Sequence, residues 1–193
     1  MSTTSAAAGA PPMLVLFDRD GTLVEDVPYN GDPRLVRALP GASGALSHLR
    51  RRGIAVGMVT NQSGIARGLI DRLQVDRVNA RVVSLLGPFD TIQVCPHGPA
   101  SNCGCRKPAP GMILAAAREL GTPIGRCAMV GDIETDMQAG ANAGVRSILV
   151  PNDATRRDEV LAAPEVAPDL WSAVALLLQR GAGVRLAGTT TGR

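Results

Sequence analysis

The chain is poor in aromatic residues. Phe, Trp and Tyr together make up only 2% of its 193 residues, although 45% of the residues are hydrophobic. Any buried core must therefore consist mainly of Ala, Val, Leu, Ile and Met. Charged residues make up 19%, and this mixture excludes a wholly disordered chain, which would combine few apolar residues with a high net charge. The length predicts one domain with a sizeable core.

Several other signals are also missing. No apolar run reaches the roughly 18 residues that a membrane span requires, and the start, "MSTTSAAAGAPP", lacks the basic and apolar regions of a secretory signal. The net charge of +3 is too small to indicate nucleic acid, and the one tight basic run, 50–52, suits a solvated helix end. We therefore expect a cytoplasmic monomer with reduced thiols that binds neither nucleic acid nor membrane.

Both ends of the chain have compositions that are typical of tails. Residues 1–12 are small and end in two prolines, and residues 181–193 are rich in Gly and Thr. Such stretches offer little apolar surface to bury. We predict flexible tails at 1–12 and 181–193, on either side of a single domain at 13–180.

Short apolar runs alternate with helical patterns in this domain. The runs suit strands that are buried on both faces of a parallel sheet, and they lie at 13–17, 54–59, 91–94, 127–130 and 147–150. Apolar residues at helical spacing predict helices at 42–52, 71–86, 110–120 and 169–178. The inward face of the third helix is expected to hold Ile113, Leu114, Ala117 and Leu120. The alternation predicts an α/β fold with a central parallel sheet flanked by helices and an active site at the carboxyl ends of the strands.

Two polar motifs follow the first two predicted strands. In "FDRDGT", Asp18 and Asp20 come directly after an apolar run. Such carboxylates can bind Mg²⁺ or attack phosphorus, although a lone D-x-D more often caps a turn. In "TNQSGIARG", the hydroxyl groups of Thr60 and Ser63 and the amide of Asn61 offer donors to a phosphate, and the alternative is an ordinary capped turn.

Two later motifs add a cation and two more carboxylates. In "CRKPAPG", Lys107 can neutralise a phosphoryl group and Arg106 can bind another part of an anionic substrate, although such a pair is usually just surface. In "VGDIETDMQAG", Asp132 ends an apolar run and Asp136 follows four residues later. One carboxylate can hold a metal while the other orients Lys107 or a metal-bound water; alternatively, both are acidic residues favoured at a helix N-terminus. A parallel sheet would bring all four motifs together.

Three of the four cysteines lie in "CPHGPASNCGC". Together with the histidine they supply three thiolates and one imidazole, a normal tetrahedral zinc set, from Cys95, His97, Cys103 and Cys105. Because four protein ligands close the site, we predict a structural Zn²⁺ that offsets the entropy of ordering the loop at 95–105. The alternative is free cysteines. The fourth cysteine, Cys127, lies in an apolar run and is predicted to be a small core residue.

The order of these motifs resembles the haloacid dehalogenase (HAD) phosphatase superfamily over residues 13–150. The stretches "DRDGT", "TNQSGIARG" and "CRKP" with an upstream "CPH" resemble its D,D-heptose 1,7-bisphosphate phosphatases and histidinol phosphatases. The resemblance implies a Rossmann-like HAD fold in which Asp18 attacks phosphorus and Asp20 is the general acid and base. It also implies Mg²⁺ held by the Asp18 carboxylate, the Asp20 backbone carbonyl and the Asp132 carboxylate, with Thr60 and Lys107 on the phosphate oxygens and Asp136 in support.

The same resemblance indicates where a substrate would bind. The implied contacts are Asp26, Tyr29, Asn61, Gln62, Ser63 and Arg106. The segment between the first strand and the helix at 42 is too short for a large cap domain, so we expect an open site whose loops determine specificity. Family members often have Lys directly after the metal-binding Gly-Asp, and Ile133 stands there instead, which removes one expected phosphate or sugar contact.

Three functions follow from this sequence. The first is a Mg²⁺-dependent phosphatase that removes the 7-phosphate of D-glycero-D-manno-heptose 1,7-bisphosphate, a phosphorylated sugar, in nucleotide-activated heptose biosynthesis. The second is a histidinol-phosphate phosphatase of histidine biosynthesis. The third, from another class, is a non-catalytic zinc-stabilised binding module. The third function is disfavoured because every expected catalytic residue is present: Asp18, Asp20, Thr60, Lys107 and Asp132.

Overall fold

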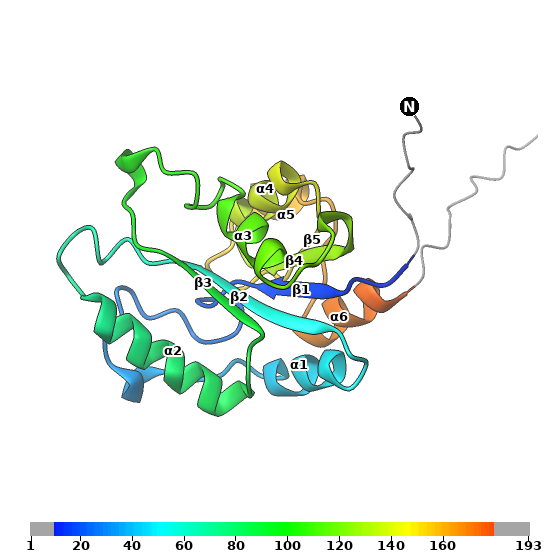
Figure 1. Ribbon diagram of the computed structural model, residues 1–193, viewed down its shortest axis with the longest axis horizontal. Coiled ribbons are helices and arrows are strands. Elements are labelled where there is room, and N and C mark those ends of the chain that lie inside the picture. Colours follow the sequence, from blue (N-terminus) through cyan, green and yellow to red (C-terminus); the bar gives the residue numbers. More distant parts are fainter. Residues whose placement is uncertain (1–9, 180–193) are drawn as a thin grey trace, which may run out of the picture.

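A five-stranded parallel sheet forms the centre of the molecule (Figure 1). The computed structural model describes residues 10–179. The strand order is β3-β2-β1-β4-β5, with β1 at Leu14–Phe17, β2 at Ala55–Asn61, β3 at Thr91–Cys95, β4 at Cys127–Gly131 and β5 at Arg146–Leu149. Each strand coincides with one of the five predicted apolar runs to within a residue or two, so the predicted sheet is confirmed.

Helices cover both faces of the sheet (Figure 1). One layer, below the sheet in Figure 1, contains α1 (Ala42–Arg50), α2 (Arg72–Leu86) and α6 (Leu170–Leu178). The other contains α3 (Gly111–Glu119), α4 (Glu134–Ala143) and α5 (Arg157–Ala162). Short 3₁₀ turns lie in the connections, η1 at Pro33–Leu35, η2 at Pro99–Ser101 and η3 at Ile124–Arg126. The three-layer arrangement confirms the α/β prediction.

Aliphatic side chains fill the two cores, one on each face of the sheet. The core beneath α1, α2 and α6 includes Phe17, Leu46, Leu49 and Val82, and the core beneath α3 and α4 includes Leu16 and Ile113. Phe17 is the one aromatic side chain that is fully buried among the described residues, as the composition predicted. Burial of these side chains provides most of the driving force for folding.

Three details of the helices differ from the sequence prediction. In α3 the buried residues are Met112, Ile113, Ala116 and Ala117, whereas Leu114 is 38% exposed. The prediction that Leu114 faces inward is wrong because the face turned to the sheet lies one residue earlier. The helices α4 and α5 had no predicted range. The buried residues of α4 are Asp136, Met137, Ala139 and Gly140, and a Cβ on Gly140 would lie 1.8 Å from the Ser147 hydroxyl oxygen. The small and polar residues of this face give no apolar stripe. The helix α5 has no buried residue and shows no apolar stripe either.

The chain runs from β1 outward to β2 and β3, and then returns to the other side of β1 as β4 and β5. The carboxyl ends of β1 and β4 therefore form the switch point of the sheet, where α/β proteins bind ligands. Between β1 and α1 the chain contains only loop and the short η1, so no large cap domain lies there, as predicted. The motifs that begin at Asp18 and Asp132 both lie at this switch point.

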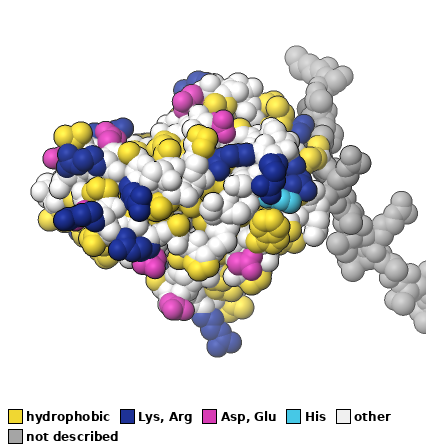
Figure 2. Space-filling view, turned by 90° about the horizontal axis from the view of Figure 1, so that it is seen from below, with side chains coloured by type: hydrophobic (Ala, Val, Ile, Leu, Met, Phe, Trp, Pro, Cys, Tyr) yellow, Lys and Arg dark blue, Asp and Glu magenta, His cyan; other side chains and the backbone are white. Residues whose placement is uncertain are grey.

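The predicted tails lie largely outside the described residues. Of the first tail only 10–12 is described, and there the Pro11 carbonyl accepts two hydrogen bonds from the Arg126 guanidinium, at 3.1 and 2.8 Å. On the face seen from below, basic side chains lie in separate groups among acidic and apolar ones (Figure 2). None of the helices within 10–179 has the length and apolar content needed to cross a bilayer.

Candidate active site and metal sites

The predicted nucleophile Asp18 directly follows β1. Its N–H donates to the Val130 carbonyl of β4 at 3.0 Å, so the hydrogen bonding of the sheet extends to this residue. Its Oδ1 accepts a hydrogen bond from the Arg19 N–H at 2.7 Å and lies 2.8 Å from the Lys107 Nζ. The residue is 7% exposed. The sheet and two donors together give the carboxylate a defined orientation.

Lys107, the only lysine of the chain, lies buried between two carboxylates. Its Nζ is 2.8 Å from Asp18 and 2.6 Å from Asp136, and it donates to the Val59 carbonyl at 3.3 Å. Burial alone would lower the pKa of Lys107, but the charges of Asp136 and Asp18 outweigh it and raise this pKa above its ordinary value. The side chain therefore stays a cation. The Asn61 side chain holds the Lys107 backbone with one hydrogen bond to its N–H and one to its carbonyl, at 3.1 and 3.2 Å.

The two carboxylates of the last motif have separate tasks in the local structure. Asp132 accepts hydrogen bonds from the Thr22 hydroxyl at 2.7 Å and from the Asn152 amide at 2.8 Å. Asp136, which is fully buried, accepts the backbone N–H groups of Asp132 and Ile133 at 3.2 and 3.3 Å at the start of α4. Asp136 thus closes the loop that presents Asp132 and, at the same time, anchors the lysine.

Glycine is required where the first motif passes Asp132. Gly21 has φ +78°, and a Cβ there would lie 2.2 Å from Asp132 Oδ2 and 2.9 Å from the Asn152 amide nitrogen. The left-handed conformation and the close approach both exclude a larger residue without rearrangement. The Gly of "DRDGT" therefore allows the loop after β1 to lie against the loop after β4.

The three carboxylates suit a divalent cation. One oxygen atom from each of Asp18, Asp132 and Asp136 lies within 4.8 Å of the other two, while Lys107 supplies one positive charge against three negative ones. Burial raises the pKa of Asp132 to about 6, with a further contribution from Asp136 and against the hydrogen bonds from Thr22 and Asn152. Burial likewise raises the pKa of Asp18 well above its usual range, although Lys107 opposes it. A hard cation with oxygen ligands relieves this excess charge, and the donor set fits Mg²⁺.

Asp20, the predicted acid and base, is held by the side chains of Arg19 and Gln62 rather than by Lys107. The Arg19 guanidinium donates to both of its carboxylate oxygens at 3.0 Å, and the Gln62 amide donates to Oδ2 at 2.9 Å. The same amide donates to the Thr60 hydroxyl oxygen at 2.8 Å. Gln62, predicted as a substrate contact, therefore also links Asp20 to Thr60, which is fully buried.

All the predicted catalytic and substrate residues line one cavity of about 420 Å³. The predicted substrate residues on its wall are Asp26, Tyr29, Asn61, Gln62, Ser63 and Arg106, and Ile133 also lies there. Tyr29 is 42% exposed, and the Arg67 guanidinium lies 5.5 Å from the centre of its ring. A larger groove of about 660 Å³ lies between η1 and α2, but no carboxylate lines it, so the chemistry points to the smaller cavity.

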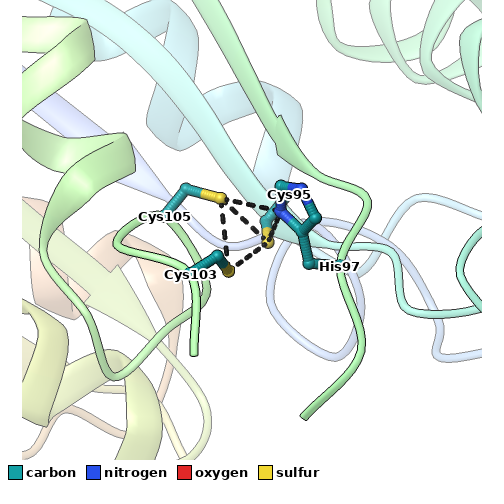
Figure 3. Close-up of side chains that lie close together, drawn as sticks. All are labelled: Cys95, His97, Cys103 and Cys105. Carbon is teal, nitrogen blue, oxygen red and sulfur yellow. Dashed lines mark hydrogen bonds between the residues drawn. The ribbon is translucent and has the colours of Figure 1, made fainter. Parts of the chain in front are cut away.

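The four predicted zinc ligands, one at the end of β3 and three in the loop after it, lie close together (Figure 3). The Cys95, Cys103 and Cys105 sulfurs lie 3.2 to 3.7 Å from one another, and the His97 Nδ1 lies 3.6 Å from the Cys95 sulfur and 3.2 Å from the Cys105 sulfur. All three cysteines are free thiols. Ligands of a tetrahedral Zn²⁺ with Zn–S bonds of about 2.3 Å are about 3.7 Å apart, so the donor set fits zinc. Cys127 is 4% exposed, which confirms it as a core residue.

The thiols of this cluster have very different acidities. Burial acts to raise the pKa of Cys103, but hydrogen bonds from the Arg106 backbone and the Ser101 hydroxyl outweigh it and lower this pKa to about 6. Burial and the neighbouring thiols raise the pKa of Cys105 to about 12. Zinc binding therefore has to displace protons from part of the cluster. The Arg106 side chain also donates to the His97 carbonyl at 3.3 Å, which ties this predicted substrate contact to the loop.

The sequence did not predict a role for four polar residues of the site: Arg19, Thr22, Asn79 and Asn152. Arg19 and Thr22 lie inside "FDRDGT", but nothing in the motif says that Thr22 would bind Asp132 or that Arg19 would be buried. Asn152 follows β5 and lies 131 residues from Gly21, whose carbonyl it also binds at 3.0 Å. A polar residue after a fifth strand was the one available signal for Asn152.

Known proteins resemble this chain along most of its length. A family model described as HAD-hydrolase-like matches residues 104–173. The D-glycero-beta-D-manno-heptose-1,7-bisphosphate 7-phosphatase of Bordetella bronchiseptica is 38% identical over 142 residues, which cover 71% of this chain and 79% of that protein. The protein of the same name from Mesorhizobium japonicum is 40% identical over 148 residues, covering 70% of this chain and 68% of its own.

Similarity in three dimensions agrees with similarity in sequence. The crystal structure of D,D-heptose 1,7-bisphosphate phosphatase from B. bronchiseptica, complexed with magnesium and phosphate, matches with a TM-score of 0.76 at 34% identity. The match covers 86% of this chain and 97% of that one. This chain therefore belongs to the HAD phosphatase family that contains the D-glycero-D-manno-heptose-1,7-bisphosphate 7-phosphatases.

Proposed function

We propose that this protein is a Mg²⁺-dependent phosphatase that removes the 7-phosphate of D-glycero-D-manno-heptose 1,7-bisphosphate. The product would enter nucleotide-activated heptose biosynthesis. The observation that supports this most is the meeting of Asp18, Asp132 and the buried Lys107 at the switch point. Relatives that are 38% and 40% identical bear the name of this reaction. That the enzyme is a cytoplasmic monomer stays a prediction.

The first step transfers the phosphoryl group to the protein. A carboxylate oxygen of Asp18 attacks phosphorus, and the bond from phosphorus to the C7 oxygen breaks with its electron pair remaining on that oxygen. Asp20 gives its proton to the departing oxygen, which leaves as the 7-hydroxyl of the sugar. Lys107 orients Asp18 through their 2.8 Å contact. The step ends with an aspartyl-phosphate on Asp18.

The second step regenerates the free carboxylate. Asp20, now ionised, takes a proton from a water molecule whose oxygen attacks the phosphorus. The bond between phosphorus and the Asp18 oxygen breaks, and inorganic phosphate is released. Gln62 helps to hold Asp20 for both proton transfers through its 2.9 Å hydrogen bond. One carboxyl group thus serves first as acid and then as base.

Charge stabilisation comes from several groups around the phosphate. Mg²⁺, when bound by the Asp18 and Asp132 carboxylates and the Asp20 carbonyl, offsets the repulsion between an anionic nucleophile and an anionic phosphate. The Thr60 hydroxyl oxygen already accepts a hydrogen bond from Gln62, so its own proton is available to a phosphate oxygen. Lys107 supplies a second positive charge.

The Cys/His loop supports the substrate side of the site. Zn²⁺ bound by Cys95, His97, Cys103 and Cys105 would hold in place a loop that has little apolar surface of its own to bury. Arg106 and Lys107 directly follow the last ligand. In this proposal the zinc is structural: it positions Arg106 toward the distal part of the substrate and takes no part in hydrolysis.

The substrate contacts come from loops at the mouth of the cavity. Asp26 and Tyr29 lie on the loop after β1, and Ser63 lies on the loop after β2. With Ile133 in place of the frequent Lys, the loop after β4 offers no side-chain cation at that position. Recognition of the bisphosphate therefore depends on Arg106 and on polar groups of the first two loops.

A comparison of substrates tests this function. Phosphate release is measured from the heptose 1,7-bisphosphate and from histidinol phosphate, with Mg²⁺ and with EDTA, and ³¹P NMR identifies the phosphate that leaves. We expect the specificity constant to be more than tenfold higher for the heptose bisphosphate than for histidinol phosphate. The ³¹P signal of the 7-phosphate should disappear, and no phosphate should be released in EDTA. A tenfold preference for histidinol phosphate would instead make this a histidinol phosphatase. No release from any ester would leave only a binding module.

A further inference from the structure

Arg19 is buried more completely than almost any other charged side chain of the described structure. It lies between the two aspartates of "FDRDGT" and is 1% exposed. A guanidinium in the interior needs partners for its N–H groups, because an unpaired buried charge is strongly unfavourable. Its Nε and Nη2 donate to the two oxygens of Asp20, both at 3.0 Å, and its Nη1 donates to the Asn79 side-chain oxygen at 2.8 Å.

The third partner comes from a different part of the fold. Asn79 lies in the middle of α2, is 5% exposed, and neighbours the buried Val78. A polar amide on the inner face of an amphipathic helix is unfavourable unless it is hydrogen-bonded. Here its side-chain oxygen accepts a hydrogen bond from Arg19, which lies 60 residues earlier in the sequence and holds Asp20. The helix beneath the sheet is thereby linked to the acid–base residue of the site.

A count of lone pairs shows what this link does to Asp20. A carboxylate can accept about four hydrogen bonds, two at each oxygen. Oδ2 accepts two, from Arg19 and from the Gln62 amide at 2.9 Å. Oδ1 accepts one, from the Arg19 Nε. One acceptor position remains open, and it is on Oδ1. With 25% of its side chain exposed, Asp20 lies at the wall of the cavity.

We propose that Arg19, oriented by Asn79, is a positioning residue that aims Oδ1 of Asp20 at the reacting phosphate. Oδ1 is then the atom that gives its proton to the leaving oxygen in the first step and takes a proton from water in the second. The proposal rests on the proposed function, in which Asp20 is the acid and base. Neither Arg19 nor Asn79 needs to touch the substrate for this role.

The leaving group distinguishes positioning from a purely structural ion pair. The specificity constant reports all steps up to the departure of the leaving group. A sugar alkoxide leaves poorly without a proton, whereas p-nitrophenolate is stable enough to leave as an anion. Misplacement of Asp20 therefore lowers the specificity constant for the sugar phosphate far more than for p-nitrophenyl phosphate. General damage to the fold or to phosphate binding lowers both alike.

The experiment compares Arg19→Lys, Asn79→Ala and the benchmark Asp20→Asn on the heptose bisphosphate and on p-nitrophenyl phosphate. Arg19→Lys keeps the charge but loses the two-pronged contact. We expect its specificity constant to fall by on the order of 10²-fold on the sugar phosphate and by less than about threefold on the aryl phosphate. Asn79→Ala is expected to show the same pattern at roughly tenfold, and Asp20→Asn the same pattern at its largest.

Arg50→Lys is the matched control. Arg50 is a partly buried arginine that holds the far end of α2, where it donates to the Leu86 and Pro88 carbonyls at 2.7 Å. We expect this change to leave both specificity constants as they are. If Arg19→Lys does not fold, as thermal unfolding will show, Asn79→Ala decides alone. Equal losses on the two substrates, or no loss on the sugar phosphate, overturn the proposal. If the unchanged protein hydrolyses neither substrate, the proposed function itself has failed.

Discussion

Two groups of side chains in this protein could each hold a metal ion, and they are built in opposite ways. The carboxylate cluster, made of Asp18, Lys107, Asp132 and Asp136, draws its members from separate segments that the sheet brings together. The Cys/His cluster, made of Cys95, His97, Cys103 and Cys105, comes from eleven consecutive residues. Ion pairs of 2.6 and 2.8 Å hold the first cluster. The second is held by weaker contacts among thiols and an imidazole.

The difference indicates what a metal ion at each cluster would be needed for. The carboxylate cluster rests on buried strands and on a lysine, so its geometry should persist when Mg²⁺ is removed, and activity alone should be lost. The Cys/His loop packs few apolar groups, so its order should depend on Zn²⁺. Under the proposed function, Mg²⁺ would therefore serve the chemistry, and Zn²⁺ would serve the structure that presents Arg106 and Lys107. The following experiments test this contrast.

The largest effect is expected for Asp18→Asn. Removal of the nucleophile should lower kcat by on the order of 10³-fold or more, whereas the free energy of unfolding should not fall. The reason is that one of three crowded negative charges disappears while Lys107 keeps Asp136 as a partner. Phosphate release and thermal unfolding measure the two quantities. Asp76→Asn, an exposed aspartate paired with Arg72, is the control and should change neither. A large loss of stability in Asp18→Asn would contradict the separation of chemistry from structure.

Lys107→Met should reduce both stability and activity. The change leaves Asp18 and Asp136 buried without their cation, which typically costs about 3–5 kcal/mol. Urea unfolding measures the loss, and added Mg²⁺ should restore part of it by neutralising the same carboxylates. Arg72→Met removes a cation from an exposed pair and should cost less than about 1 kcal/mol. Unchanged stability in Lys107→Met would show that the lysine does not hold the carboxylate cluster together.

Cys103→Ser tests the second cluster. Loss of one of four ligands should lower the zinc content and increase hydrogen exchange across 95–107, while the sheet keeps its protection. The specificity constant should fall by roughly tenfold, because a displacement of Arg106 and Lys107 by about 1 Å is enough for such losses. Cys127→Ser, which changes a cysteine outside the cluster, should keep its zinc. Full zinc content together with full activity in Cys103→Ser would rule out the role of the metal proposed above.

The smallest effect is expected far from both clusters, at the contact of His48 with Trp171. The ring centres lie 4.8 Å apart, and Trp171 is the only tryptophan of the chain. Partial burial, and then the charges of Arg52 and Arg51, lower the pKa of His48 below its ordinary value of 6.5. The unfolded chain therefore binds this proton more readily than the folded one, and the free energy of unfolding should fall as pH drops below about 6.5.

Tryptophan fluorescence measures this effect directly. Protonation of His48 should change the Trp171 emission in the folded protein at a pH below about 6.5. The variant His48→Gln should lose this change and should leave kcat unaffected. If the emission change persists in His48→Gln, another group near Trp171 is responsible.

The sequence predicted those features whose signals are local. Each strand appeared as a bounded apolar run, and the Cys/His cluster was predicted because four ligand-type residues lie within eleven positions. The helix α4 was missed because three of its four buried residues are Asp136, Ala139 and Gly140, which show no apolar stripe, and Gly140 is needed where the helix approaches Ser147 of β5. Leu114 was assigned to the wrong face because apolar spacing alone could not say which side of α3 meets the sheet.

Partnerships between buried polar groups could not be predicted in the same way. The hydrogen bonds from Thr22 and Asn152 to Asp132, and from Arg19 to Asn79, join residues that only the folded chain brings together. A polar residue in sequence looks the same whether it faces water or the interior. Asn61 and Gln62 illustrate this: the motif suggested substrate contacts, and the structure shows their amides also holding Lys107 and Asp20.

By itself, then, the amino-acid sequence determined the apolar runs, the chemistry available at each strand end and the grouping of three thiols and one imidazole in the Cys/His loop, because these depend on neighbours along the chain. The sequence predicted that the four motifs would meet, but tertiary structure alone decided their contacts: the 2.8 and 2.6 Å ion pairs of Lys107 with Asp18 and Asp136, and the hydrogen bonds by which Arg19 holds Asp20. The physical reason is that burial brings distant charges within a few ångströms and removes the water that would otherwise separate them.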